Sequence, residues 1–226
     1  MQISDLKLQK EIQLSHSDAL IIVDVQNDFL PGGALAVPGG HEIISGINAV
    51  SALFDKTYYK IVLTQDWHPP NHKSFASVYP GKDPFDVYSA EGIGPVLWPD
   101  HCVQGQKGAD FSPLLNTYVA DLIVRKGLNP EIDSYSTFIE NDKKSKTGLS
   151  GYLESVGISR IFLCGLALDY CVYFSAIDGK NLGFDVFIII DLTKGIDDPA
   201  GSISNSLEDM VKRGIKFINS KLLLNK

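Results

Sequence analysis

LIIVDVQNDF, residues 20–29, joins a run of branched apolar residues to a carboxylate at Asp24. Apolar runs of this kind are typical of parallel strands that are buried on both faces. They alternate along the chain with segments of helical periodicity. The strands are expected at 19–25, 60–64, 122–124, 160–164, 184–190 and 215–218, and the helices at 42–56, 149–156, 167–180 and 202–213. The sequence therefore predicts an α/β fold, a three-layer α/β/α sandwich around a six-stranded, mainly parallel sheet.

The chain of 226 residues, 44% of them hydrophobic, is long enough for one sizeable domain. We expect a single domain over 1–226, with its core at about 18–220 and an N-terminal extension at 1–17. The extension is polar and mixed in charge, so it is not expected to be a signal peptide.

Composition excludes several classes of partner. The net charge is −7 and basic patches with interleaved aromatics are absent, so we expect no nucleic-acid partner. The apolar runs have the length of strands, so no membrane-spanning helix is expected. Three cysteines without close pairing favour a reducing compartment, and we expect a cytoplasmic protein. The sequence leaves open whether identical copies associate.

Reactive side chains follow three of the predicted strands: Asp24, Lys126 in LIVRKG, and Cys171 in IFLCGLALDYCV. The carboxyl ends of parallel strands meet at one edge of a sheet, where ligands bind. A helix N-terminus and the cation of Lys126 are expected to lower the pKa of Cys171. Asp24 can then carry the proton between the thiol and a leaving amine. The alternatives are an inert buried thiol, a capping carboxylate and a solvated lysine.

The segment 65–112 lacks periodicity and is rich in Pro, Gly, Trp, Tyr and His, as functional loops often are. Asp66 and His68 flank one residue in LTQDWHPPNH, so both point to the same side of an extended chain. A third ligand is available from His72 or His101. These N and O donors suit Zn²⁺, Mn²⁺ or Fe²⁺, although surface histidines are the alternative. Such an ion is expected to stand apart from the thiol and to hold the substrate.

Three aromatic residues close to these motifs, Phe29, Trp98 and Phe138, are candidates for clamping a flat ring. Each of them can instead be ordinary loop packing. The other two cysteines, Cys102 and Cys164, are expected to be inert.

Four segments resemble one family: DVQNDFLPGGALAVPGG, TQDWHPPNHKSFAS, WPDHCVQG and GLALDYCVYFSA. They are similar to nicotinamidases (pyrazinamidases) among the isochorismatase-like cysteine hydrolases, over about residues 18–195. The resemblance implies hydrolysis of nicotinamide to nicotinate and ammonia through a cysteine thioester, in NAD salvage, with pyrazinamide as a further substrate. The N-terminal extension and the tail after Asp198 contain no motif that supports the resemblance.

The same resemblance implies roles for individual residues. Asp24, Lys126 and Cys171 would be catalytic, and Asp66, His68 and His101 would bind one divalent metal ion, with zinc favoured. The role of His72 stays open. A cis peptide would join Leu166 to Ala167, and the N–H groups of Ala167 and Cys171 would form an oxyanion hole. The substrate would contact Phe29, Trp98, Leu166 and Ala167.

Other functions stay open at this point. The protein could be a related enzyme with the same fold that hydrolyses another small amide or an N-carbamoyl compound. Such enzymes keep the acid–lysine–cysteine set but lack the metal cluster. A catalytically silent binding module of the same fold is a further alternative. The segment after Lys126 resembles the family more loosely, so the role of Tyr135 is left undecided.

Overall fold

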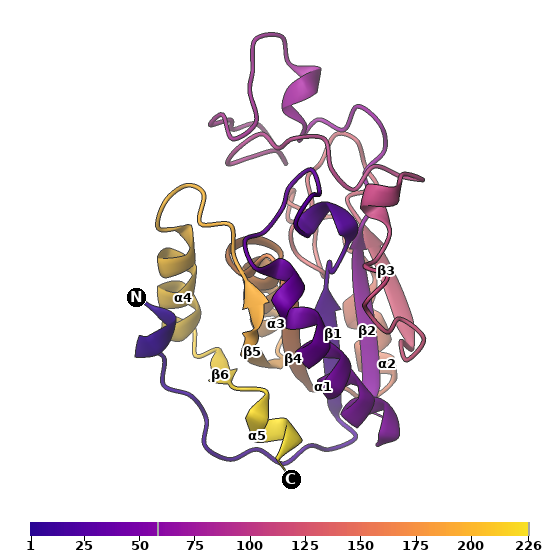
Figure 1. Ribbon diagram of the computed structural model, residues 1–226, viewed down its shortest axis with the longest axis vertical. Coiled ribbons are helices and arrows are strands. Elements are labelled where there is room, and N and C mark those ends of the chain that lie inside the picture. The colour runs from indigo at the N-terminus through magenta and orange to yellow at the C-terminus, as the bar shows by residue number, and fades with distance from the viewer. Residues whose placement is uncertain (58, 226) are drawn as a thin grey trace.

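The computed structural model describes residues 1–57 and 59–225, and residues 58 and 226 of the expected domain lie outside this description. Its centre is a six-stranded sheet with the order β3-β2-β1-β4-β5-β6, in which every neighbouring pair is parallel (Figure 1). The strands are β1 (Asp18–Val23), β2 (Lys60–Asp66), β3 (Leu122–Lys126), β4 (Arg160–Leu166), β5 (Asp185–Lys194) and β6 (Lys216–Ile218). The predicted α/β sandwich is confirmed, with a sheet that is wholly parallel.

Helices cover both faces of the sheet because each buried strand presents apolar side chains to both sides. Leu20 and Ile22 of β1 pack in one core with α1 (Ile44–Lys56) and α5 (Lys221–Leu224). Ala19 and Ile21 pack in the opposite core with α2, α3 and α4. These three helices span Leu149–Ser155, Tyr173–Asn181 and Ser202–Lys212. In Figure 1, α1 and α5 lie on the near side of the sheet.

Several predicted boundaries differ from the observed ones. A 3₁₀ turn at Gly40–Ile43 precedes α1, and a π-helical turn at Leu168–Val172 precedes α3. The last residues of β5 pair with β4 beyond a register shift, and exposed Asp191 interrupts the apolar run that marks the strand in the sequence. Strands β2 and β3 extend to Asp66 and Lys126, so these two side chains lie at the strand ends themselves.

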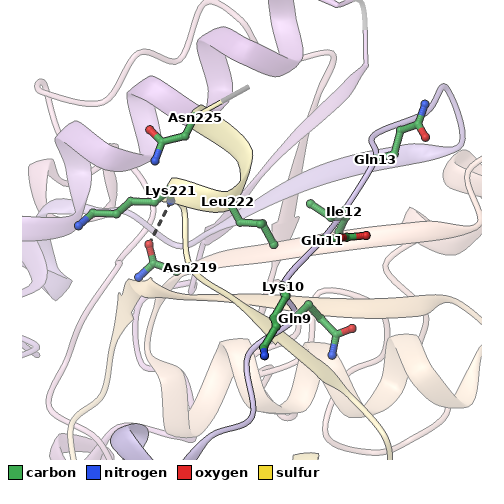
Figure 2. A pocket seen from close by; sticks show the side chains of 9 residues that line it. All are labelled: Gln9, Lys10, Glu11, Ile12, Gln13, Asn219, Lys221, Leu222 and Asn225. Atoms are coloured by element: carbon green, nitrogen blue, oxygen red, sulfur yellow. Dashed lines mark hydrogen bonds between the residues drawn. The ribbon is translucent and has the colours of Figure 1, made fainter.

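The segment 1–17 runs beside the sheet edge formed by β6. The N–H of Gln9 donates to the carbonyl of Phe217, and the terminal amine of Met1 lies 2.9 Å from Glu208 on α4. An open groove of about 780 Å³ lies between this segment and α5, and Figure 2 shows the side chains that line it. Most of its lining residues are polar or charged: the amides Gln9, Gln13, Asn219 and Asn225, together with Lys10, Glu11 and Lys221. Among residues 1–57 and 59–225, no helix has both the length and the apolar character needed to cross a membrane.

Candidate active site

The predicted reactive side chains meet at the carboxyl edge of the four adjacent strands β3, β2, β1 and β4. Asp24 follows β1 directly and has a left-handed backbone, with φ 49°. Asp66 and Lys126 end β2 and β3, and they are register partners across the two strands. Cys171 lies in the π-helical turn that follows β4. Parallel pairing therefore brings together residues that are far apart in the chain.

Asp24 is fully buried and its two carboxylate oxygens have different surroundings. Oδ1 accepts a hydrogen bond from the hydroxyl of Thr64 at 2.6 Å. Oδ2 lies 3.0 Å from Nζ of Lys126 but accepts no hydrogen bond within the described residues. A buried oxygen of this kind is free to accept a proton from a neighbouring group. Sequence reasoning missed Thr64, which orients this carboxylate from the adjacent strand.

Lys126 is fully buried and contacts every member of the reactive group. Its ammonium forms ion pairs with Asp24 and Asp66, donates to the carbonyl of Ser134 at 2.9 Å, and lies 3.5 Å from Sγ of Cys171. Burial alone would lower the pKa of Lys126, but the carboxylates of Asp24 and Asp66 outweigh it and hold that pKa well above its ordinary value. Lys126 is therefore a permanent cation at the centre of the site.

The expectation of a lowered pKa at Cys171 is wrong. Burial raises the pKa of this thiol well above its ordinary value, and the cation of Lys126 opposes the shift without cancelling it. The carboxylates of Asp24 and Asp66 raise the pKa further. This shift favours the thiol form of Cys171, so its nucleophilicity depends on losing the proton to a nearby base.

Asp66, His68 and His101 form a second cluster that adjoins the first. Oδ2 of Asp66 lies 3.8 Å from Nε2 of His68 and 4.0 Å from Nε2 of His101. One ligand atom from each of the three residues lies within 4.8 Å of the others, and all three side chains are buried. The other oxygen of Asp66 contacts Lys126. An ion was expected to stand apart from the thiol, but the two clusters adjoin because they share Asp66.

Both histidine rings of this cluster are held in one tautomer. Nδ1 of His68 donates to the carbonyl of Gly127 at 3.1 Å, and Nδ1 of His101 donates to that of Pro99 at 2.8 Å. Burial lowers the pKa of both rings, so they are neutral and each Nε2 presents a lone pair to Asp66. Gly127 has φ +69°, and a Cβ there would lie 2.4 Å from Cε1 of His68. Only glycine lets the ring pack this closely.

The donor set fits a divalent cation. Two neutral imidazoles and one carboxylate, each oriented by backbone contacts, are the ligands that Zn²⁺ and similar ions bind. A further observation favours a positive charge here: the buried carboxylate of Asp133 faces the same cavity, and its Oδ2 has no hydrogen-bond partner within the described residues. Burying an unpaired carboxylate is costly, and a nearby cation offsets that cost. Sequence reasoning missed Asp133.

His72 lies beside this cluster with both ring nitrogens engaged elsewhere. Its Nδ1 is 2.8 Å from the hydroxyl of Ser74, and its Nε2 donates to the carbonyls of Asn129 and Ile132 at 2.9 Å and 3.1 Å. Its ring centroid is 4.3 Å from that of His68. In this arrangement His72 packs against a candidate ligand and directs neither nitrogen at the cluster.

A small cavity of about 20 Å³ lies between the two clusters, with Cys171 from one and Asp66 and His101 from the other in its lining. Among the expected substrate contacts, Phe29, Trp98 and Ala167 line it together with Cys171. Its remaining walls come from Leu35, Asp66, His101, Asp133, Tyr135, Tyr170 and Ile196. The aromatic and aliphatic walls with few polar groups are typical of a site for a small flat molecule. The volume is that of about one water molecule, so a ring must displace wall side chains on entry.

Two expected wall residues do not line this cavity. Phe138 packs in the core between the sheet and α3, with its ring stacked 5.7 Å from that of Phe184. Leu166 is fully buried and packs in the opposite core, against Gly40. Hydrophobic periodicity could not identify Phe138 as a core residue, because the segment around it is neither helix nor strand. The Leu166–Ala167 peptide is cis, as the resemblance implied.

Comparison with known proteins places the chain in a family. The isochorismatase domain model matches residues 18–221. The chain belongs to the isochorismatase family. A nicotinamidase of Acinetobacter baylyi is 45% identical over 96% of this chain and 99% of its own length. The resemblance inferred from the four motifs is therefore confirmed.

Solved structures of family members agree with this assignment. A nicotinamidase/pyrazinamidase of Acinetobacter baumanii superposes with a TM-score of 0.89 and 45% identity, covering 94% of this chain and 100% of that one. A pyrazinamidase of Pyrococcus horikoshii in complex with zinc has a TM-score of 0.73 and 36% identity, covering 90% and 99%. The fold therefore matches its relatives over nearly the whole length of both chains.

Proposed function

We propose that this isochorismatase-family protein is a nicotinamidase, which hydrolyses nicotinamide to nicotinate and ammonia and also accepts pyrazinamide. One observation carries the proposal: Asp66 joins the acid–lysine–cysteine group to the two-histidine cluster across a single aromatic-walled cavity. A thiol with a base supports amide hydrolysis in general. The adjoining donor cluster narrows the substrate to a flat amide that carries a second, metal-binding nitrogen.

The first half of the reaction forms a thioester. Asp24 accepts the proton of the Cys171 thiol through Oδ2, which accepts no hydrogen bond within the described residues, and the sulfur attacks the amide carbonyl carbon. The oxyanion accepts hydrogen bonds from the N–H groups of Ala167 and Cys171. Asp24 then returns the proton to the departing nitrogen, the C–N bond breaks, and ammonia leaves.

The second half releases the acid. Asp24 accepts a proton from a water molecule, whose oxygen attacks the thioester carbonyl. The C–S bond breaks, and Cys171 recovers a proton from Asp24. Lys126 stays protonated throughout, and its charge stabilises both the carboxylate of Asp24 and the sulfur while it carries negative charge.

Asp66, His68 and His101 would hold one divalent ion, for which we propose Zn²⁺, although these donors also suit Mn²⁺ and Fe²⁺. When bound, such an ion would supply a Lewis acid beside the cavity, able to hold a ring nitrogen of the substrate. The solved pyrazinamidase of Pyrococcus horikoshii in complex with zinc supports this choice. We further propose a role in NAD salvage and a cytoplasmic location, since all three cysteines carry free thiols.

Ammonia release from nicotinamide and from benzamide tests the proposal. Benzamide carries the same amide group on a benzene ring, which has the size of pyridine but no ring nitrogen, so it probes the donor cluster separately from the thiol. We expect turnover of nicotinamide and at least tenfold lower kcat/KM on benzamide, which corresponds to about 1.4 kcal/mol of lost transition-state stabilisation. No release from either amide would overturn the function. Equal rates on both would keep an amidase but reject the role of the cluster.

A further inference from the structure

We propose that Asp28 is a positioning residue, which holds the His101 loop against the ion cluster and ties that loop to the wall of the substrate cavity. The inference rests on the ion site proposed above. It concerns a side chain that touches neither the cavity nor the cluster and acts through its neighbours.

Asp28 connects two loops through three hydrogen bonds. Its Oδ2 accepts the backbone N–H of Cys102 at 2.7 Å, directly after the candidate ligand His101. Its Oδ1 accepts the N–H of Ala34 at 3.3 Å, and its carbonyl accepts that of Leu35 at 2.9 Å. One side of Asp28 is therefore fixed to the cavity wall at Leu35, and the other side is fixed to the ligand loop.

The residue that Asp28 anchors is in a costly conformation. Cys102 has φ 48°, a left-handed backbone that residues with a side chain seldom adopt. Its carbonyl accepts the N–H of His68 at 3.0 Å, so the same residue is bound to Asp28 on one side and to a second candidate ligand on the other. The turn at Cys102 therefore sets the separation of His101 from His68, and Asp28 holds that turn.

The carboxylate of Asp28 packs closely against the backbone of a neighbouring loop. A Cβ at Gly108 would lie 2.1 Å from Oδ2 of Asp28, so the carboxylate rests directly on the Gly108 backbone. Phe29, the next residue, forms part of the cavity wall, and its ring lies 5.6 Å from that of His101. Loss of the carboxylate should thus disturb ion binding and the ring contact together.

The test uses purified full-length chains stripped of metal: wild type, Asp28→Ala, Asp28→Ser, Asp28→Asn and the control Asn27→Ala. Asn27 is the neighbouring residue, and its Nδ2 donates at 2.8 Å to Lys107, in a segment that carries no candidate ligand. Zn²⁺ affinity is measured by competition with a chromogenic chelator, and kcat and KM for nicotinamide are measured on the reloaded proteins. Thermal unfolding of the metal-free chains reports stability separately.

We expect Asp28→Ala and Asp28→Ser to weaken Zn²⁺ binding about 10- to 100-fold and to raise KM more than they lower kcat. Asp28→Asn keeps an acceptor oxygen and should retain most of the affinity, and Asn27→Ala should bind Zn²⁺ as wild type does. Equal Zn²⁺ affinity in wild type and the Ala and Ser variants would overturn the inference. Unfolding of both those variants would also overturn it, because Asp28 would then be a general structural residue. Wild type that binds no Zn²⁺ would instead reject the ion site itself, and this inference with it.

Discussion

Asp66 and Lys126 are register partners at the ends of β2 and β3, and the carboxylate of Asp66 forms an ion pair with the buried ammonium of Lys126. The second oxygen of the same carboxylate faces His68 and His101. A single residue thus belongs to both the acid–lysine–cysteine group and the candidate ion cluster. The carboxylate of Asp66 would therefore stand between an ion held at the cluster and the ammonium of Lys126.

The central position of Lys126 makes it important for stability. Lys126→Met leaves two buried carboxylates, Asp24 and Asp66, without their cation. We expect the free energy of unfolding to fall by about 3–5 kcal/mol, measured by urea denaturation of the metal-free protein. Lys60→Met removes an exposed ion pair with Asp121 and should cost less than about 1 kcal/mol. Similar losses in the two variants would contradict the central role of Lys126.

Cys171→Ala should abolish ammonia release while nicotinamide still binds. The nucleophile is absent, so kcat should fall by roughly 10⁴-fold or more. Cys164→Ala is the matched control, because Cys164 is buried within β4 and lies outside the cavity lining. That variant should lose some stability and keep its kcat. Ammonia release by Cys171→Ala at a rate near wild type would remove the thioester from the mechanism.

The two histidines beside the cluster should differ in their effect on metal content. His101→Ala removes a ring whose Nε2 faces Asp66, so this variant should lose the one ion that a three-ligand site holds. His72→Ala removes hydrogen bonds to Ser74, Asn129 and Ile132, so it should lower stability by about 1–3 kcal/mol and keep the ion. Atomic spectroscopy after desalting measures the content. A loss of metal in the His72 variant equal to that in the His101 variant would make His72 a ligand.

Substitution of Phe29 should weaken substrate binding, whereas substitution of Phe138 should leave it unchanged. Phe29 lines the cavity, whereas Phe138 packs in the core beneath α3. Phe29→Leu is expected to raise KM for nicotinamide about tenfold with a smaller change in kcat. Phe138→Leu should lower the melting temperature and leave KM unchanged. Steady-state kinetics decide, and a raised KM in the Phe138 variant would place that ring at the substrate after all.

Much of the molecule could be predicted before its structure was known. Continuous apolar runs, such as the one that ends at Asp24, predict parallel strands because strands buried on both faces need apolar residues at every position. Parallel pairing then places Asp24, Lys126 and Cys171 at one edge. The family followed from four motifs, and the comparisons confirm it. The assignment of catalytic and ion-binding roles stays a prediction.

The sequence by itself determined the fold, the family and the reactive residue types, because these depend on local periodicity and on short motifs. Tertiary structure alone decided that Asp66 serves both clusters, that His72 points away and that Phe138 lies in the core. It also shows that burial raises the pKa of Cys171 and that the attraction of Lys126 opposes this shift without cancelling it. Such properties depend on burial and on distances between segments far apart in the chain, which spacing along one segment does not encode.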